Sequence, residues 1–193
     1  LSLEEQKMVS DASSHFDRIV VVLNVGGMVD TSWFACNPKI GAVLLAWQGG
    51  MEGAMAEADI LCGDVNPSGK LTDTFAASFD DYPSSAGFNE SRDYVCYTED
   101  IFVGYRYFET IPGAAEKVNY PFGFGLSYTT FRLEPLISQG DDERIFVTVR
   151  VTNTGNTTGR EVVQVYSSAP QSRLDMPKLE LRAFQKTRLL QPG

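Results

Sequence analysis

The chain has 193 residues, of which 43% are hydrophobic and 21% are charged, as is usual for one or two globular domains. Its 16 Lys and Arg against 25 Asp and Glu give a net charge of −9, which argues against binding a nucleic-acid backbone. No apolar run is long enough to cross a membrane as a helix.

The first third of the chain alternates between helical and strand patterns. The sequence predicts a helix over residues 2–16, in which Ser2 and Glu5 form a capping box. Two unbroken apolar runs, 18–23 and 40–46, predict strands covered on both faces, as in a parallel sheet. Short helical patterns at 30–36 and 55–63 complete half of an α/β layered sandwich with a partial, mostly parallel sheet.

The middle of the chain, from about residue 64 to 128, carries turn residues and many aromatic side chains. More than half of all the aromatic residues lie between Tyr82 and Phe131. Because irregular segments so rich in aromatic residues need a surface to pack on, we expect this region to be ordered. The sequence thus predicts one α/β domain over residues 1–128, with an aromatic-rich irregular segment at 82–128.

The last third predicts a second domain over residues 129–193. Alternating apolar residues predict strands at 130–138, 144–152 and 162–166, with one or two more at 179–190. These make only about four of the seven strands of an immunoglobulin or fibronectin III-like β-sandwich. We expect a truncated sandwich with open edges, which missing strands or a partner would cover.

Two glycine-rich segments resemble nucleotide-binding loops and fail the comparison. Residues 63–70 have the wrong glycine spacing for a phosphate loop, and Leu71 stands where a hydroxyl should bind magnesium, so we predict a turn. Residues 23–27 lack the third glycine of a dinucleotide fingerprint.

The chain offers few residues for metal or nucleophilic chemistry. His15 is the only histidine and has no partner for a catalytic triad or a metal site. Cys36, Cys62 and Cys96 match no metal-binding spacing, and we expect buried thiols.

One cluster in the aromatic segment carries chemistry that suits a carbohydrate. Tyr97, Glu99, Asp100 and Arg106 combine an aromatic ring with carboxylates and a guanidinium, groups that could hold a sugar. The alternative is a structural Arg–carboxylate pair beneath packed tyrosines. These four residues are the candidate substrate-binding set.

Several segments together resemble glycoside hydrolase family 3, of the bacterial β-glucosidase type. The segments similar to its α/β domain are 43–53, 58–75, 97–109 and 120–128, and those similar to its fibronectin III-like domain are 151–155 and 161–166. Thr72 departs from the family, which often has Pro there. The order and spacing of these segments fit across nearly the whole chain.

The resemblance implies a retaining glycosidase that needs two carboxylates about 5–5.5 Å apart and no cofactor. In the family, a nucleophilic Asp lies on a (β/α)₈ barrel, and the acid/base Glu lies on a loop that ends shortly before a segment such as Leu1–Gln6. We therefore expect no catalytic residue in this chain, and we expect the polypeptide to continue beyond both ends. Glu4, Glu5 and Glu52 are interpreted as residues at helix starts.

The resulting hypothesis is a part of a β-glucosidase that supports the acid/base loop and docks on a barrel, with a β-linked glucoside as the substrate of the whole enzyme. Two alternatives stay open. One is a non-catalytic carbohydrate-binding module. The other is an interaction module that forms a dimer through its open β edge.

Overall fold

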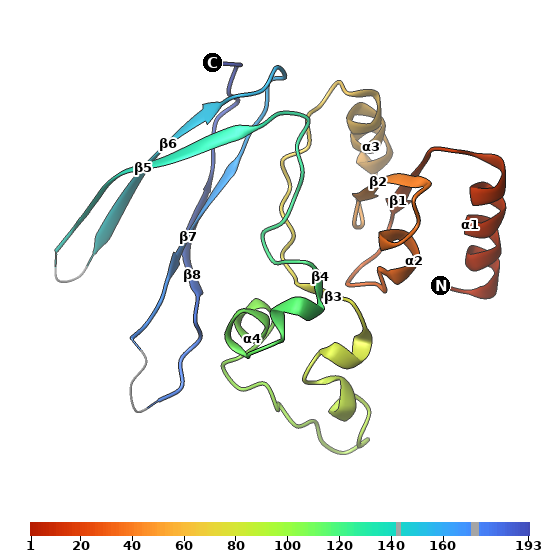
Figure 1. Ribbon diagram of the computed structural model, residues 1–193, viewed down its shortest axis with the longest axis horizontal. Coiled ribbons are helices and arrows are strands. Elements are labelled where there is room, and N and C mark those ends of the chain that lie inside the picture. The colour runs from red at the N-terminus through yellow and green to blue at the C-terminus, as the bar shows by residue number, and fades with distance from the viewer. Residues whose placement is uncertain (142–143, 171–173) are drawn as a thin grey trace. The chain divides into compact units, whose positions relative to one another are not determined.

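The computed structural model describes residues 1–141, 144–170 and 174–193 (Figure 1). The chain divides into two compact units. The first unit comprises Leu1–Glu57 and Asp73–Phe122, and the second comprises Ala58–Thr72 and Gly123–Gly193. Both units are therefore discontinuous in sequence. No helix in the described part of the chain is long and apolar enough to span a bilayer.

Helix α1, Leu3–His15, begins at the predicted capping box. The Ser2 hydroxyl accepts from the Glu5 amide at 3.2 Å, and the Glu5 carboxylate accepts from the Ser2 amide at 2.7 Å. Glu5 is thus a helix-start residue, as predicted. Helix α1 has no buried residue, so its cap rather than a packed face defines its beginning.

The predicted parallel sheet is present as a pair of strands, β1 and β2. Strand β1, Ile19–Leu23, pairs in parallel with β2, Ile40–Leu45. Only one face of β1 is half-buried, whereas Val20 and Val22 on the other face are 55% and 38% exposed. The prediction of strands covered on both faces is therefore wrong for the described residues, since these supply cover to one face only.

Two helices follow the strands near the predicted positions. They are α2, Ser32–Ala35, and α3, Gly53–Cys62. Asp30 precedes α2, and its carboxylate accepts from the Ser32 amide at 2.8 Å. This backbone hydrogen bond lowers the pKa of Asp30.

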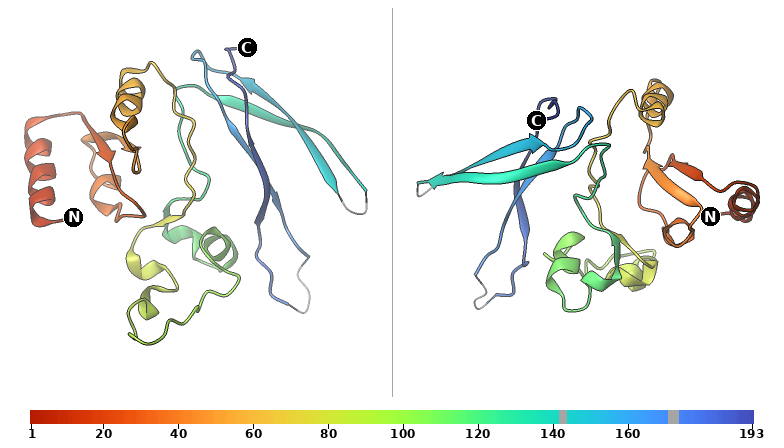
Figure 2. Two further views of the ribbon diagram at one scale, coloured as in Figure 1. Left: turned by 180° about the vertical axis from the view of Figure 1, so that it is seen from behind. Right: turned by 45° about the horizontal axis from the view of Figure 1, so that its top comes forward.

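The irregular middle of the first unit contains short elements that the sequence did not predict. Strands β3 and β4 form a small antiparallel pair next to helix α4 and three 3₁₀ turns (Figure 2). Their bounds are β3, Phe75–Ala76; η1, Phe79–Asp81; η2, Ser85–Gly87; α4, Tyr105–Thr110; η3, Ala115–Lys117; and β4, Val118–Tyr120. Ala76, Phe108 and Ala114 form a buried core there, against which aromatic rings pack.

Tyr82 holds this core together. Its ring lies edge-on to Phe108 with 5.7 Å between centroids, and its hydroxyl donates to the Thr74 carbonyl at 2.9 Å and accepts from the Ala76 amide at 2.8 Å. Burial raises the pKa of Tyr82. These contacts give the aromatic segment a packed surface around Tyr82 and Phe108.

The second unit carries four longer strands in two antiparallel pairs. Strand β5, Phe131–Gly140, pairs with β6, Ile145–Asn153, and β7, Val162–Ser167, pairs with β8, Glu180–Lys186. A single bridge joins Gly159 to Leu190. This element order confirms the predicted fold class, an α/β part followed by a truncated fibronectin III-like part.

Asn153 joins the ends of these strands. Only 1% of its surface is exposed, and its amide donates to the carbonyls of Thr157 and Leu190 at 2.9 and 3.0 Å. Its side-chain oxygen accepts from the Thr129 hydroxyl at 2.7 Å. A buried amide with all its partners fixes one arrangement of the connecting turns.

The prediction of buried thiols is wrong. Cys36, Cys62 and Cys96 are all exposed. Cys36 follows α2, Cys62 is the last residue of α3, and Cys96 lies in a loop, and such positions at the ends of elements and in loops are commonly at the surface.

Candidate functional site

The carboxyl ends of β1 and β2 carry two glycine-rich loops that touch each other. A Cβ added to Gly26 after β1 would lie 3.1 Å from the Gln48 side chain, which follows β2. Trp47 has a left-handed backbone with φ of 55°, which is rare for a bulky residue. The carboxyl edge of parallel strands is where α/β proteins place binding loops.

The predicted sugar-binding cluster lies in the loop that leads to α4. The Tyr97 ring is 92% exposed, so it is not one of the packed tyrosines of the structural alternative. Glu99 is half-buried and accepts from the Ser84 hydroxyl at 3.2 Å. Arg106 lies in the first turn of α4, where its amide donates to the Val103 carbonyl at 3.3 Å.

Asp100 has a left-handed backbone with φ of 49°. This conformation turns the chain immediately after Glu99, whose carbonyl accepts from the Phe102 amide at 2.8 Å. The structure thus places Glu99 and Asp100 on one tight turn, with Tyr97 two residues earlier. The turn combines an exposed ring with two carboxylates, chemistry that suits the hydroxyl groups of a sugar or a polar protein surface.

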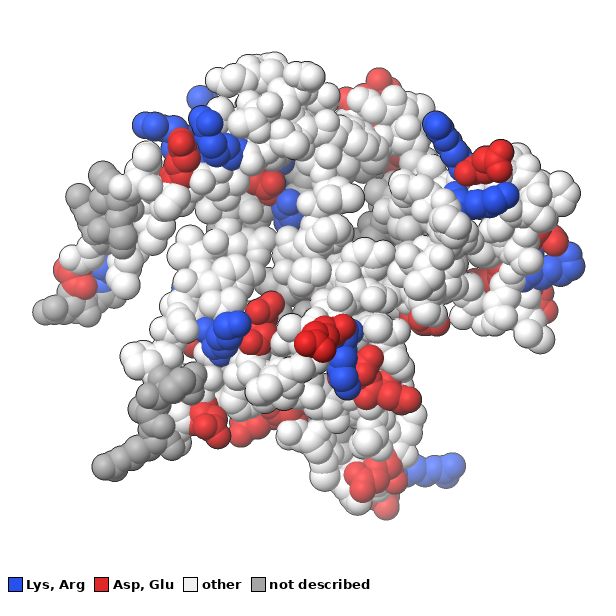
Figure 3. All heavy atoms as spheres, viewed as in Figure 1, with Lys and Arg blue, Asp and Glu red and all other residues white. Residues whose placement is uncertain are grey.

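The described residues offer no group of three His, Cys, Asp or Glu side chains that could hold a metal ion. His15 ends α1, and its Nδ1 contacts the Asp11 carbonyl at 2.8 Å. Among the described residues on the face that Figure 3 shows, Lys and Arg lie singly or beside acidic groups rather than in one continuous patch.

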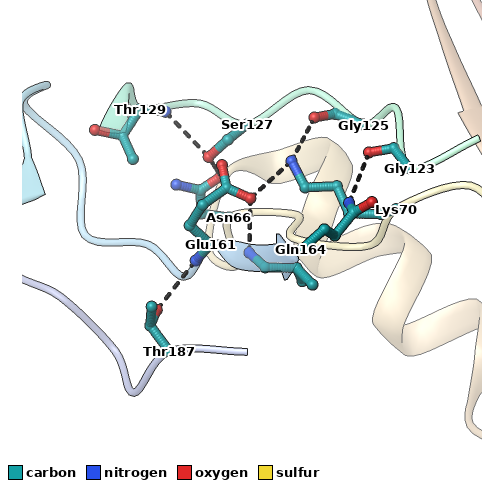
Figure 4. A network of polar contacts seen from close by, with 10 residues as sticks. Asn66, Lys70, Gly123, Gly125, Ser127, Thr129, Glu161, Gln164 and Thr187 are labelled. Carbon is teal, nitrogen blue, oxygen red and sulfur yellow. Dashed lines mark hydrogen bonds and ion pairs between the residues drawn. The ribbon is translucent and has the colours of Figure 1, made fainter. Parts of the chain in front are cut away.

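In the segment that resembles a phosphate loop, residues 63–70, the side chains of Lys70 and Asn66 bind other groups of the protein. Lys70 donates to Glu161 and to the Gly125 carbonyl, both at 2.9 Å. The Asn66 amide donates to the Thr158 carbonyl at 3.1 Å. The Asn66 oxygen accepts from the Ser127 hydroxyl at 2.9 Å, and Figure 4 shows both of these residues. The sequence predicted a turn here and missed this network.

The signal for the network was weak in the sequence. A lysine and an asparagine four residues apart suggest solvent exposure, and Glu161 lies 91 residues after Lys70. The glycines in segments 63–70 and 120–128 are the one signal that could have indicated a close approach of two backbones at this place.

Comparison with known proteins places the chain in a family. Residues 1–128 match the model of the glycosyl hydrolase family 3 C-terminal domain, and residues 161–193 match the fibronectin type III-like domain. The chain therefore belongs to glycosyl hydrolase family 3, as its sequence motifs indicated.

Similar proteins carry the name β-glucosidase. β-Glucosidase A of Butyrivibrio fibrisolvens is 57% identical over the whole chain, and a β-glucosidase of Ruminococcus albus is 43% identical over 98% of it. The chain spans 25% and 19% of the length of these two curated relatives.

Solved structures agree over the full chain. A β-glucosidase from Paenibacillus barengoltzii superposes with a TM-score of 0.94 at 46% identity, over 100% of this chain and 21% of that one. β-Glucosidase 3B from Thermotoga neapolitana in complex with glucose gives a TM-score of 0.90 at 42% identity, over 100% of this chain and 27% of that one.

Proposed function

We propose that this chain forms the supporting part of a retaining β-glucosidase, next to a (β/α)₈ barrel in the same enzyme. The observation that carries the proposal is that the chain matches β-glucosidases along its whole length while making up only about a quarter of them. In this proposal both catalytic carboxylates come from other residues, and the substrate is a β-linked glucoside.

The role of the chain in this proposal is mechanical. A retaining mechanism needs two carboxyl groups about 5–5.5 Å apart on either side of the scissile bond. The α/β part would hold the acid/base loop, and a surface of the chain would pack on the barrel. The exposed apolar face of β1, with Val20 and Val22, supports a role in packing because large apolar surface is costly in water.

A chimaera tests this proposal directly. The matching region of B. fibrisolvens β-glucosidase A is replaced by this chain, and hydrolysis of p-nitrophenyl β-glucoside is measured for the chimaera and for the chain alone. We expect activity only in the chimaera. Enzyme-like turnover by the stringently purified chain, or a folded chimaera without any β-glucosidase activity, would contradict the proposal.

We further propose that Tyr97, Glu99, Asp100 and Arg106 line the surface that meets the substrate or the barrel. The 92% exposure of Tyr97, two and three residues before Glu99 and Asp100, supports this role. In the chimaera, Tyr97→Ala should raise KM or lower kcat at least severalfold. The control is Tyr94→Ala, because Tyr94 lies in the same loop and is only 55% exposed. Unchanged kinetics for Tyr97→Ala would remove it from the site.

The exposed ring also favours the carbohydrate-binding alternative. Titration of the chain alone with cellobiose in a calorimeter separates the two ideas. We expect no heat of binding if the chain only supports an enzyme. Saturable heat that Tyr97→Ala abolishes would favour a binding module instead.

The dimer through an open β edge is a separate proposal. Exposed apolar residues on β6, including Ile145 and Phe146, support it because a two-stranded ribbon is marginal by itself. Sedimentation velocity of the chain should then show association that Phe146→Lys weakens. A monomer at all concentrations would exclude the dimer.

A further inference from the structure

We propose that residues 63–72, hereafter the strap, are a built-in ligand of the second unit and are held there by a latch of Asn66, Lys70 and Glu161. The strap lies in the same compact unit as Gly123–Gly193, although the residues 73–122 between them belong to the other unit. The inference does not depend on the proposed function.

The charged half of the latch is the Lys70–Glu161 pair. The two side chains are only 17% and 16% exposed, and Nζ to Oε1 is 2.9 Å. The Lys70 ammonium also donates to the Gly125 carbonyl at 2.9 Å. Because both charged side chains are mostly shielded from water, removing one leaves the other charge unpaired and poorly solvated. The loss of stability is then far larger than for breaking an ion pair on the surface.

The neutral half of the latch is the Asn66 amide. Its oxygen accepts from the Ser127 hydroxyl at 2.9 Å and from the Tyr128 amide at 2.8 Å, and its nitrogen donates to the Thr158 carbonyl at 3.1 Å. The Tyr128 amide can only donate and the Thr158 carbonyl can only accept, so these partners fix the orientation of the side chain. Figure 4 shows Lys70 with its partners Glu161 and Gly125, and Asn66 near its partner Ser127, all of which are more than 50 residues away from them in the sequence.

The strap backbone also pairs with the segment after residue 122. The Leu71 amide donates to the Phe124 carbonyl at 2.7 Å, and the Gly123 amide donates to the Leu71 carbonyl at 2.8 Å. A Cβ on Gly125 would lie 2.2 Å from the Gly69 carbonyl oxygen, which leaves room for glycine only. The contact is thus a backbone-to-backbone fit as well as a side-chain latch.

The last turn of α3 also forms hydrogen bonds with the strap and with the segment that binds it. The Tyr128 hydroxyl donates to the Ile60 carbonyl at 2.8 Å, and the Val65 amide donates to the Asp59 carbonyl at 3.1 Å. The groups that bind the strap are thus spread from Gly123 to Glu161. It follows that the second unit is stable only with the strap bound, and that residues 129–193 are not an independent folding unit.

Hydrogen exchange of the full chain, read by mass spectrometry, tests the latch. In Lys70→Met, amides of residues 63–72 and 123–128 should exchange about tenfold or more faster, since a hydrogen bond to a charged group is lost. Strands β1 and β2 should keep their exchange rates. Lys7→Met, which breaks an exposed ion pair with Asp11 on α1, is the control and should change neither region.

A second set of variants keeps the proposal testable if Lys70→Met unfolds the unit. Glu161→Met should loosen the same two segments, and the double variant Lys70→Met/Glu161→Met should be less loosened than the two single effects combined. The proposal is overturned if the single variants leave exchange in 63–72 and 123–128 unchanged, if β1 and β2 loosen equally, or if the effects add without coupling.

Discussion

Asp100 and Trp47 are the two non-glycine residues with a left-handed backbone in the described part of the chain. Side chains with a Cβ rarely adopt this conformation, although Asp tolerates it better than most. Tyr82, by contrast, is held by hydrogen bonds between its hydroxyl and two backbone groups. Single residues of both kinds make measurable contributions to stability.

Replacing Asp100 should separate backbone strain from side-chain effects. Because glycine adopts φ of 49° freely, Asp100→Gly should stabilise the chain by about 0.5–1 kcal/mol, whereas Asp100→Ala should destabilise it by a similar amount. Urea unfolding with an unchanged m-value would measure both. Equal stability of the two variants would show that the turn is not strained.

Tyr82→Phe should destabilise the first unit by about 1–3 kcal/mol, because the buried Ala76 amide and Thr74 carbonyl lose their partner. Tyr94→Phe, in an exposed loop, is the matched control and should have little effect. Chemical denaturation of both variants measures the difference.

Tyr82 should also make the chain sensitive to alkali. Burial raises the pKa of Tyr82 above the ordinary value of 10.0, so the unfolded chain loses this proton first as the pH rises. Its contribution is complete below pH 10 and is lost as the pH rises through the folded-state pKa. Unfolding measured between about pH 9 and pH 11 should show a smaller loss of stability in Tyr82→Phe than in the unmodified chain.

Elements follow local signals closely where such signals exist. Helix α1 begins at its capping box, and the parallel pair of β1 and β2 matches the two apolar runs. Strands β5 to β7 follow the alternating patterns. By contrast, α4 and the pair of β3 and β4 have six, two and three residues, which is too short for a periodic pattern, and they form because the core around Phe108 holds them.

Helix α1 should respond to its cap alone. Ser2→Ala removes the hydroxyl that accepts from the Glu5 amide and should cost the helix about 1 kcal/mol. Because α1 has no buried residue, the loss should appear as faster hydrogen exchange near its start rather than as global unfolding. Ser10→Ala, on the exposed middle of the helix, should slightly stabilise it; a global loss of stability in Ser2→Ala would contradict this prediction.

At the scale of the whole molecule, the chain folds into two units that each combine distant segments. The second unit joins residues 58–72 to residues 123–193, and the first joins residues 1–57 to residues 73–122. The sequence predicted instead a boundary at residue 128, where the family model also ends. The domain boundary at residue 128 therefore stays a prediction. The two compact units state something different, namely which segments of the chain pack together.

Two matched glycine substitutions test the close approach of the backbones at Gly69 and Gly125 in the second unit. Gly125→Ala should destabilise the chain by about 1–3 kcal/mol, because its Cβ would lie 2.2 Å from the Gly69 carbonyl oxygen. Gly69→Ala, whose Cβ would meet no atom within 4 Å, should change stability by less than about 0.5 kcal/mol. Thermal unfolding of the two variants measures the difference, and equal effects would refute the predicted clash.

The sequence by itself determined the α/β order, the four longer strands, the cap of α1 and the membership of glycosyl hydrolase family 3. These features depend on local periodicity or on strings of neighbouring residues, which are visible without a fold. The candidate cluster was visible only as residue types, while the exposure of Tyr97 and the turn at Asp100 depend on tertiary packing.

The tertiary structure alone decided that Lys70 pairs with Glu161 and that the cysteines are exposed. Contacts between residues more than 50 positions apart produce no repeating pattern in the sequence, because the residues around each partner reflect only the local secondary structure. The free energy of such a contact comes from removing both groups from water together, and that happens only when the folded chain brings them to the same place.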